Sequence, residues 1–382
     1  MASSSVMEIC DLRSSTSRRL CSTISRSVAG ISCAFGMRSG SPSGVGSGRM
    51  GWSSGGWGMG LIVAGVLGFF AGPALAQAVD SSGVSQMRVE DIVAQAQTYK
   101  LWILLISTLL VLALLFAGGL LTPGGFAKAG LRDVSPMPAV VWLFSGMVVL
   151  LAMSSAGAVV SGSGWLQQSS LDDSQRQVIV TLVGFAFGVV AGLGMLFILK
   201  RSAPDAGMRL SWLDVPVGFG CFMLAYPVVE LMSMAGAGLH RQFSEGMDPP
   251  RIAHPILQRL VDNSSDPWAW ALVGGAVIGA PFVEELVYRV FLQGALIKIT
   301  KSPWISIITG GLIFALMHRV GAPEARVPWH ALLPIFAIGV ACGVGYERTK
   351  RVGVPITMHM CFNLLNVLLA LLIAPEVATT GV

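Results

Sequence analysis

Residues 268–297 read WAWALVGGAVIGAPFVEELVYRVFLQGALI, and this stretch decides the fold because it places two glutamates and an arginine inside a long apolar run. About 20 apolar residues in a helix are enough to cross the ~30 Å hydrocarbon core of a bilayer. Each ionisable side chain inside such a helix costs on the order of 2.5–3.5 kcal/mol on insertion scales, so each needs a reason. The stretch therefore predicts a membrane helix that carries functional groups.

The composition of the whole chain also indicates a membrane protein. Only 12% of the 382 residues are charged, 53% are hydrophobic, and the mean hydropathy is +0.71. Soluble domains carry roughly 25% charged residues, so a soluble enzyme is excluded. The net charge of +5 comes without a long basic tract, so no nucleic-acid partner is expected. The six cysteines form no CxxC pair, which argues against a disulfide framework or a zinc knuckle.

The N-terminal part, residues 1–76, differs from the rest of the chain. A leader rich in Ser, Gly and Arg, expected to be disordered, precedes an apolar run that closes on the small-x-small sequence Ala74–Ala76. This order is typical of a secretory signal peptide. An uncleaved extra helix is the alternative, with an organelle transit peptide as the weaker one, and Met37, Met50 and Met59 are alternative starts to Met1. A secretory leader favours a multi-pass protein of the bacterial inner membrane.

Eight apolar segments predict an all-α polytopic protein with about eight transmembrane helices. We expect a polar segment at 77–98, a four-helix membrane region at 99–237, a loop at 238–267 and a second membrane region at 268–375. Basic residues gather in alternate loops, so the positive-inside rule predicts that both mature termini lie outside the cytoplasm. The eight segments are 99–121, 137–160, 177–199, 212–237, 268–297, 304–318, 329–346 and 352–374.

Ionisable and amide side chains gather on the last four apolar segments. Glu285 and Arg289 are four residues apart and share one helix face, which predicts an ion pair between them. Glu284 lies about 100° further around the helix and must face another group. Tyr288 is one turn from Glu284 and is placed to orient it. The remaining polar candidates are His318, His359 and Asn363.

These residues are expected to lie at similar depths in the membrane. At 1.5 Å per residue, Glu284 and His318 lie about 21 Å from the predicted cytoplasmic ends of their helices, His359 about 12 Å and Asn363 about 18 Å. A buried carboxylate is a competent general base, and a histidine can hold and polarise a water. A second histidine with an asparagine amide can stabilise an oxyanion by about 2.7–4 kcal/mol per donor. The set suggests water attack on a carbonyl, hence peptide hydrolysis.

Other chemistry and other functions stay open at this point. The sequence has no GxSxG, P-loop or HExxH motif. We commit to no metal or other cofactor, although Glu284, His318 and His359 could hold a divalent ion such as zinc. Buried Glu and His residues also make proton relays in carriers, but no internal repeat pairs the two halves of this chain. A non-catalytic immunity or scaffold protein is a third hypothesis, and Glu230 is either a structural hydrogen-bonding group or a substrate contact.

At these motifs the sequence resembles the CAAX-protease and bacteriocin-processing (CPBP, or Abi) family of intramembrane proteases. The resemblance covers roughly residues 265–375, under a third of the chain, and no motif position departs from the pattern. It rests on three motifs in order, Glu284-Glu285-x-x-x-Arg289, Phe314-x-x-x-His318 and His359-x-x-x-Asn363.

The resemblance implies an all-helical bundle with its active site in a membrane cavity, and a membrane-associated protein or peptide as substrate. It implies that Glu284 activates water with the help of His318. It also makes His359 and Asn363 an oxyanion hole, and makes Glu285 with Arg289 a pair that shapes the site. The resemblance allows both a metal-dependent and a glutamate-based mechanism, and we favour the latter slightly.

Overall fold

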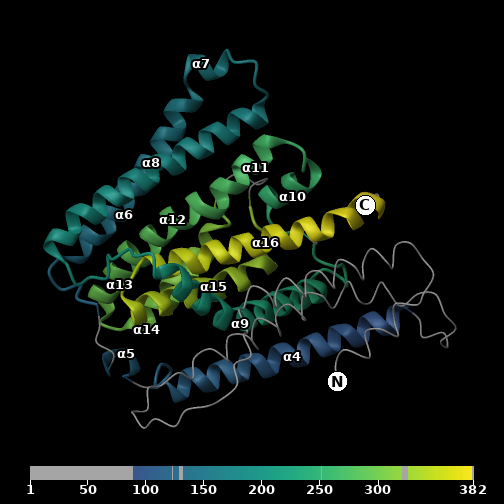
Figure 1. Cartoon of the computed structure of the whole chain (residues 1–382), viewed down its shortest axis with the longest axis horizontal. Coiled ribbons are helices and arrows are strands. Elements are labelled where there is room, and N and C mark those ends of the chain that lie inside the picture. The colour runs from purple at the N-terminus through teal and green to yellow at the C-terminus, as the bar shows by residue number, and fades with distance from the viewer. Residues whose placement is uncertain (1–88, 123, 129–131, 251, 321–325, 381–382) are drawn as a thin grey trace, which may run out of the picture. The chain divides into compact units, whose positions relative to one another are not determined.

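The computed structural model describes residues 89–122, 124–128, 132–250, 252–320 and 326–380, and these residues form helices without any strand (Figure 1). The predicted leader and signal peptide lie outside the described residues. The helices are α4 (Val89–Ala117), α5 (Gly125–Lys128), α6 (Ala139–Ser161), α7 (Gly164–Gln167), α8 (Asp173–Ser202), α9 (Asp214–Phe243), α10 (Pro255–Asp262), α11 (Pro267–Gly274), η2 (Gly275–Gly279), α12 (Ala280–Glu285), η3 (Leu286–Leu292), α13 (Gln293–Thr300), α14 (Pro303–Met317), η5 (Trp329–Ala331), α15 (Leu332–Thr349) and α16 (Gly353–Thr380).

Within this described part, seven helical segments are long and apolar enough to cross a membrane. The sixth of the eight predicted segments, 304–318, forms α14, whose 15 residues span only about 22 Å. The prediction of an all-α polytopic membrane protein is confirmed, with seven full-length spans and one shorter apolar helix. The seven are Gln95–Ala117, Ala139–Ser161, Asp173–Ser202, Asp214–Phe243, Pro267–Thr300, Trp329–Thr349 and Gly353–Leu372.

Two boundaries differ from the sequence prediction. α4 begins at Val89, inside the segment predicted as polar and non-membrane. Its first turns are helical but too polar for lipid, and hydropathy marks only the part of a helix that fits a membrane. The predicted loop 238–267 contains the end of α9 and the short helix α10.

Polar residues followed by proline start three of the helices near the candidate site. His254, Asp266 and Ser302 each accept a hydrogen bond from a backbone N–H in the first turn of α10, α11 and α14 respectively, and a proline follows each of them. A side-chain acceptor at the N-cap satisfies an otherwise unpaired donor, and proline at the first helical position loses no hydrogen bond. These local signals fix where the helices begin.

Glycines let α8 approach the helix that carries the two glutamates. A Cβ atom at Gly188 would lie 3.0 Å from Val283, and one at Gly192 would lie 2.5 Å from Leu286. Both distances are too short for a side chain, so the close packing requires glycine at these positions.

Several inter-helix segments meet at one end of the helices. Arg132 pairs with Glu347 at 2.6 Å, and the N–H of Val352 donates to the carbonyl of Arg209 at 3.1 Å. The loops that hold most of the predicted cytoplasmic basic residues therefore lie together. The side of the membrane that they face stays a prediction.

The last helices form the interior of the described region. In the spans Pro267–Thr300 and Trp329–Thr349, 44% of the apolar window is buried, against 17% in Gln95–Ala117. α16 contacts α9, α12 and α15, as its ribbon in Figure 1 shows. The candidate residues lie on these interior helices.

Candidate active site

The two glutamates lie on a membrane helix that contains two π-helical segments. The π-helical segments η2 and η3 flank α12, which ends at Glu285. Such π-turns are rare and occur frequently at functional sites. The predicted membrane helix over 268–297 is confirmed, and its two π-helical segments were not part of the prediction.

Pro281 accounts for a free carbonyl group in the first π-turn. In η2 the N–H of Ala280 donates to the carbonyl of Gly275, five residues back, so the carbonyl of Ala276 loses its α-helical donor. Its π-helical donor would be the N–H of residue 281, and proline has none. Asn363 of α16 takes this place, because its Nδ2 donates to the Ala276 oxygen at 2.8 Å. One amide hydrogen of Asn363 thus ties α16 to η2.

Glu285 is fully buried, and two partners share its carboxylate. Its Oε2 lies 2.8 Å from Nε of Arg289, which is the ion pair expected from the four-residue spacing. Its Oε1 lies 3.0 Å from Nδ1 of His359 on α16. A carboxylate bonded to Nδ1 fixes the orientation of an imidazole ring and favours the proton on that nitrogen. Glu285 therefore positions both a guanidinium and an imidazole.

Glu284 has a different environment. Its side chain is 30% exposed, and its Oε2 lies 3.9 Å from Nε2 of His359, which is too far for a direct hydrogen bond. This oxygen is itself buried and has no hydrogen-bond partner in the described parts of the chain. Both atoms are therefore available to one bound group, such as a water or a substrate oxygen.

The ring of Phe314 lies between the remaining polar residues. Its centroid is 4.9 Å from the ring of His318, 5.5 Å from that of His359 and 5.2 Å from that of Tyr288, while the Arg289 guanidinium lies 4.9 Å from it. Edge-to-face rings and a cation over a ring are both favourable contacts. Phe314 belongs to the second motif, but the sequence did not predict its role as the common packing surface for these residues.

His318 and Tyr288 lie close to the cluster, but among the described residues neither forms a hydrogen bond with Glu284. Nδ1 of His318 lies 2.9 Å from the Phe314 carbonyl oxygen, which leaves Nε2 for another contact. Tyr288 packs against Phe314, and no hydrogen bond joins it to Glu284 among the described residues. The predicted orienting contact of Tyr288 is therefore not formed.

The residues do not fit a three-ligand metal site. The optional ligands were Glu284, His318 and His359. Within the described residues, no group of three His, Cys, Asp or Glu side chains is close enough to hold a metal ion. One nitrogen of His359 is already bonded to Glu285. No step proposed below therefore involves a metal.

Glu230 lies outside this cluster and has a partner of its own. Its Oε1 is 2.5 Å from Nζ of Lys100, so the pair connects α9 to α4. A carboxylate in an apolar span needs such a compensating charge. The structural interpretation of Glu230 is supported over the substrate contact.

A comparison with protein families identifies the region that holds the site. Residues 266–365 match the model of the type II CAAX prenyl endopeptidase Rce1-like family. No curated protein and no solved structure matches the chain. The matched region contains all three motifs described above. Residues 266–365 of this chain are therefore similar to the Rce1-like family of type II CAAX prenyl endopeptidases, in agreement with the resemblance that the three motifs carry.

Proposed function

We propose that the protein is an intramembrane endopeptidase, which hydrolyses a peptide bond of a membrane-associated protein or peptide. One observation carries this proposal. A buried oxygen of Glu284 without a hydrogen-bond partner among the described residues faces Nε2 of His359 at 3.9 Å, inside the region that matches the protease family. In a purely structural contact we would expect both atoms to be paired, because an unmade hydrogen bond in a buried site is costly.

In this proposal Glu284 is the general base. Its carboxylate takes one proton from a water as the water oxygen bonds to the carbonyl carbon of the substrate. The protonated carboxyl group then gives this proton to the leaving amine as the C–N bond breaks. The 30% exposure of the Glu284 side chain leaves it accessible to a substrate, whereas Glu285 is fully buried and contacts Arg289 and His359.

His359 and Asn363 would stabilise the oxyanion that forms in this step. Asn363 uses one amide hydrogen on Ala276 and retains a second one. His359 donates from Nε2 when the ring carries two protons, and the two adjacent carboxylates would balance that charge. His318 would assist through its Nε2, because its Nδ1 is in contact with Phe314.

The substrate class is proposed no more narrowly than a membrane-associated protein or peptide. The name of the matching family refers to CAAX prenyl proteins as the substrates of its members. A bacterial location, which the leader predicts, would call for another lipid-linked or membrane-bound peptide.

The test compares protein termini in membranes of cells that express the wild-type protein or Glu284→Gln at matched levels, by mass spectrometry. Removal of a general base should reduce cleavage by about 10²–10⁴-fold, so the new termini should disappear. Glu245→Gln is the matched control, since Glu245 is an exposed acid far along the chain from the motifs. Its profile should equal that of the wild type.

Two outcomes would argue against the proposal. Termini that persist in Glu284→Gln would remove Glu284 from the mechanism. Profiles that are identical with and without the protein would contradict the protease function and favour the proton-coupled carrier or the immunity or scaffold protein. Proton-coupled uptake that is lost in Glu284→Gln would then favour the carrier over the immunity or scaffold protein.

A further inference from the structure

A cationic cavity lies at the end of the helices where the basic loops meet. Its volume is about 640 Å³, and four of its lining residues are the cations Lys200, Arg209, Lys350 and Arg351, against Asp205 as the acid. Arg351 is paired with Asp214 at 2.6 Å, and Arg209 lies 3.8 Å from Asp205. Within the described residues, Lys200 and Lys350 have no ion-pair partner, so the cavity retains an excess of positive charge.

The walls of this cavity are held by buried contacts. Arg132 donates to the carbonyl of Ala206 at 3.0 Å, and the hydroxyl of Tyr346 donates to the same oxygen at 3.3 Å. Gly207 follows with φ +87, and a Cβ there would lie 2.6 Å from the Arg132 side chain. The segment that carries Arg209 is therefore fixed by a buried network and does not depend on a ligand for its shape.

An apolar groove adjoins the cationic cavity. It has a volume of about 430 Å³ and shares Leu210 and Ser211 with the cavity. One face of α16 lines it from Gly353 to Met360, a rise of about 10 Å along the helix. Met360 follows the site residue His359 directly. The groove thus leads from the charged helix ends toward the depth of the candidate active site.

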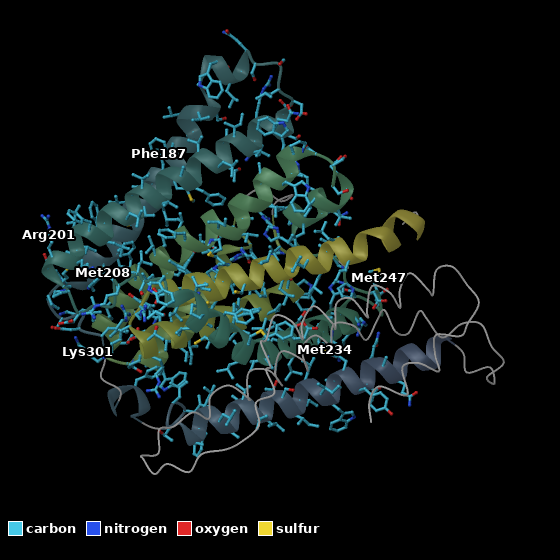
Figure 2. All side chains as sticks on the ribbon, viewed as in Figure 1. Phe187, Arg201, Met208, Met234, Met247 and Lys301 are labelled. Atoms are coloured by element: carbon cyan, nitrogen blue, oxygen red, sulfur yellow. The ribbon has the colours of Figure 1, made fainter. Side chains whose placement is uncertain are left out.

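The position of the cavity matches the headgroup level of a membrane. Trp212, which lines the groove before the first turn of α9, is 78% exposed. Exposed tryptophan at the end of a membrane helix is typical of the lipid–water interface. Figure 2 labels the basic residues Arg201 and Lys301 at the same end of the helices as Met208.

We propose that the cavity and groove together bind one anionic phospholipid. Its phosphate lies among Lys200, Arg209 and Lys350, and the first part of one acyl chain lies in the groove along α16. Basic pockets between membrane helices bind anionic headgroups in this way. The positive-inside rule explains basic residues on loops, but it does not require them to line a cavity that continues into an apolar groove. Charge complementarity and the adjoining groove favour a lipid over a free anion.

The test measures binding to the purified full-length protein in a non-ionic detergent by isothermal titration calorimetry. The probes are dihexanoyl phosphatidylglycerol, dihexanoyl phosphatidylcholine and inorganic phosphate. We expect phosphatidylglycerol to bind at least about 10-fold more tightly than either other probe, since each nearby cation strengthens binding to an anionic lipid. Added salt should weaken this binding.

A matched pair of double variants separates the cavity from general surface charge. Lys200→Gln with Arg209→Gln removes two cations that line the cavity, and it should weaken phosphatidylglycerol binding by at least about 10-fold. Arg201→Gln with Lys301→Gln removes one lysine and one arginine from the same end, outside the cavity lining. This control should change the affinity by less than about 2-fold. Equal losses in the two variants, or no loss in either, would overturn the proposal.

A third variant tests the groove. Val215 lines the groove and is 60% exposed, so Val215→Trp narrows it without disturbing the packed interior. The variant should weaken phosphatidylglycerol binding and leave phosphate binding unchanged. Inorganic phosphate that binds the wild type as tightly as the lipid would show an anion site in place of a lipid site. An unchanged lipid affinity in Val215→Trp would show that no chain occupies the groove.

Discussion

Two buried arginine–glutamate pairs involve the interior helices, and they differ in what surrounds them. At one end, Arg132 contacts Glu347 at 2.6 Å, and the same carboxylate accepts a hydrogen bond from Gln293 at 2.8 Å. In the interior, Arg289 contacts Glu285 at 2.8 Å, and this carboxylate also contacts His359 at 3.0 Å. Both pairs are almost completely inaccessible to solvent.

The difference lies in the groups that each ion pair contacts next. Among the described residues, the further contacts of the Arg132 pair end in backbone carbonyls and a tyrosine ring. Oε2 of Glu347 is buried without a hydrogen-bond partner there, but no partly exposed acid faces this network, and in that sense it is closed. In the Arg289 pair the second nitrogen of His359 faces the partly exposed Glu284, and the network is open toward a ligand. The comparison suggests that one pair joins the segment before α6 to α15, whereas the other positions a reactive group. Buried ion pairs alone therefore do not identify a site.

The largest expected effect concerns the Arg289 pair. Glu285→Gln leaves a buried arginine without its counter-charge, which should cost about 3–5 kcal/mol of stability. Adding Arg289→Met removes this unpaired charge and should restore most of the lost stability. Cleavage should remain at least about 100-fold below wild type in the double variant, because His359 has lost the carboxylate that orients it. Thermal unfolding in detergent and cleavage per folded molecule measure the two effects.

A double variant that regains both stability and cleavage would contradict the positioning role of Glu285. The pair would then be a structural connection like the Arg132 pair, and the comparison would lose its basis.

The same substitutions at the Arg132 pair should change stability in the same way but leave cleavage unchanged in the double variant. Glu347→Gln should destabilise the protein by about 3–5 kcal/mol for the same electrostatic reason. Arg132→Met combined with Glu347→Gln should recover stability and should also show wild-type cleavage per folded molecule. Both quantities are measured as for Glu285. Cleavage that stays low in this double variant would show that the closed network also affects the chemistry.

The sequence predicts the fold and part of the site because both depend on regular spacing. All eight predicted apolar segments are helical, and the four-residue spacing of Glu285 and Arg289 correctly predicts their pair. Contacts between residues far apart in the sequence could not be predicted in this way, and Arg132 and Glu347, for example, are 215 positions apart. The contact between His359 and Glu285 likewise joins residues that are 74 positions apart. The oxyanion role of His359 and Asn363 stays a prediction.

The π-turns show most clearly why the rest could not be predicted. Hydrophobic periodicity does not resolve one extra residue in a turn, so the pattern over 268–297 predicts a helix but not its π-turns. Pro281 was the available signal, because a proline inside a span leaves a carbonyl without a donor. The sequence does not show that Asn363 supplies the missing donor, since this depends on how α16 packs on η2.

Asn363→Ala should therefore have a medium effect on stability. It leaves the Ala276 carbonyl without a donor, which should cost about 1–3 kcal/mol in thermal unfolding. The matched control is Asn366→Ala on the same helix, whose amide donates to the Phe362 carbonyl four residues back. That carbonyl keeps its helical partner, so the control should cost less.

Pro281→Ala sharpens this prediction because it returns an N–H to the first π-turn. In the Pro281→Ala background, Asn363→Ala should be less destabilising than in the wild type. Equal costs in the two backgrounds would show that the Asn363 amide does not substitute for the missing proline donor.

The last effect is a pH dependence of stability that is expected at His254, outside the spanning helices. Burial, and secondarily the charge of His318, lowers the pKa of His254 to about 4, while its Nδ1 accepts the N–H of Ile256 at 3.2 Å. An unfolded histidine takes up its proton near pH 6.5. The folded state therefore binds fewer protons between about pH 6.5 and 4, so this contribution to stability is complete above pH 6.5 and is lost as the pH falls through this range. His254→Asn keeps a good N-cap without a titrating ring. Its melting temperature in detergent should fall less than that of the wild type from pH 6.5 to 4, and parallel curves would exclude His254 as the titrating group.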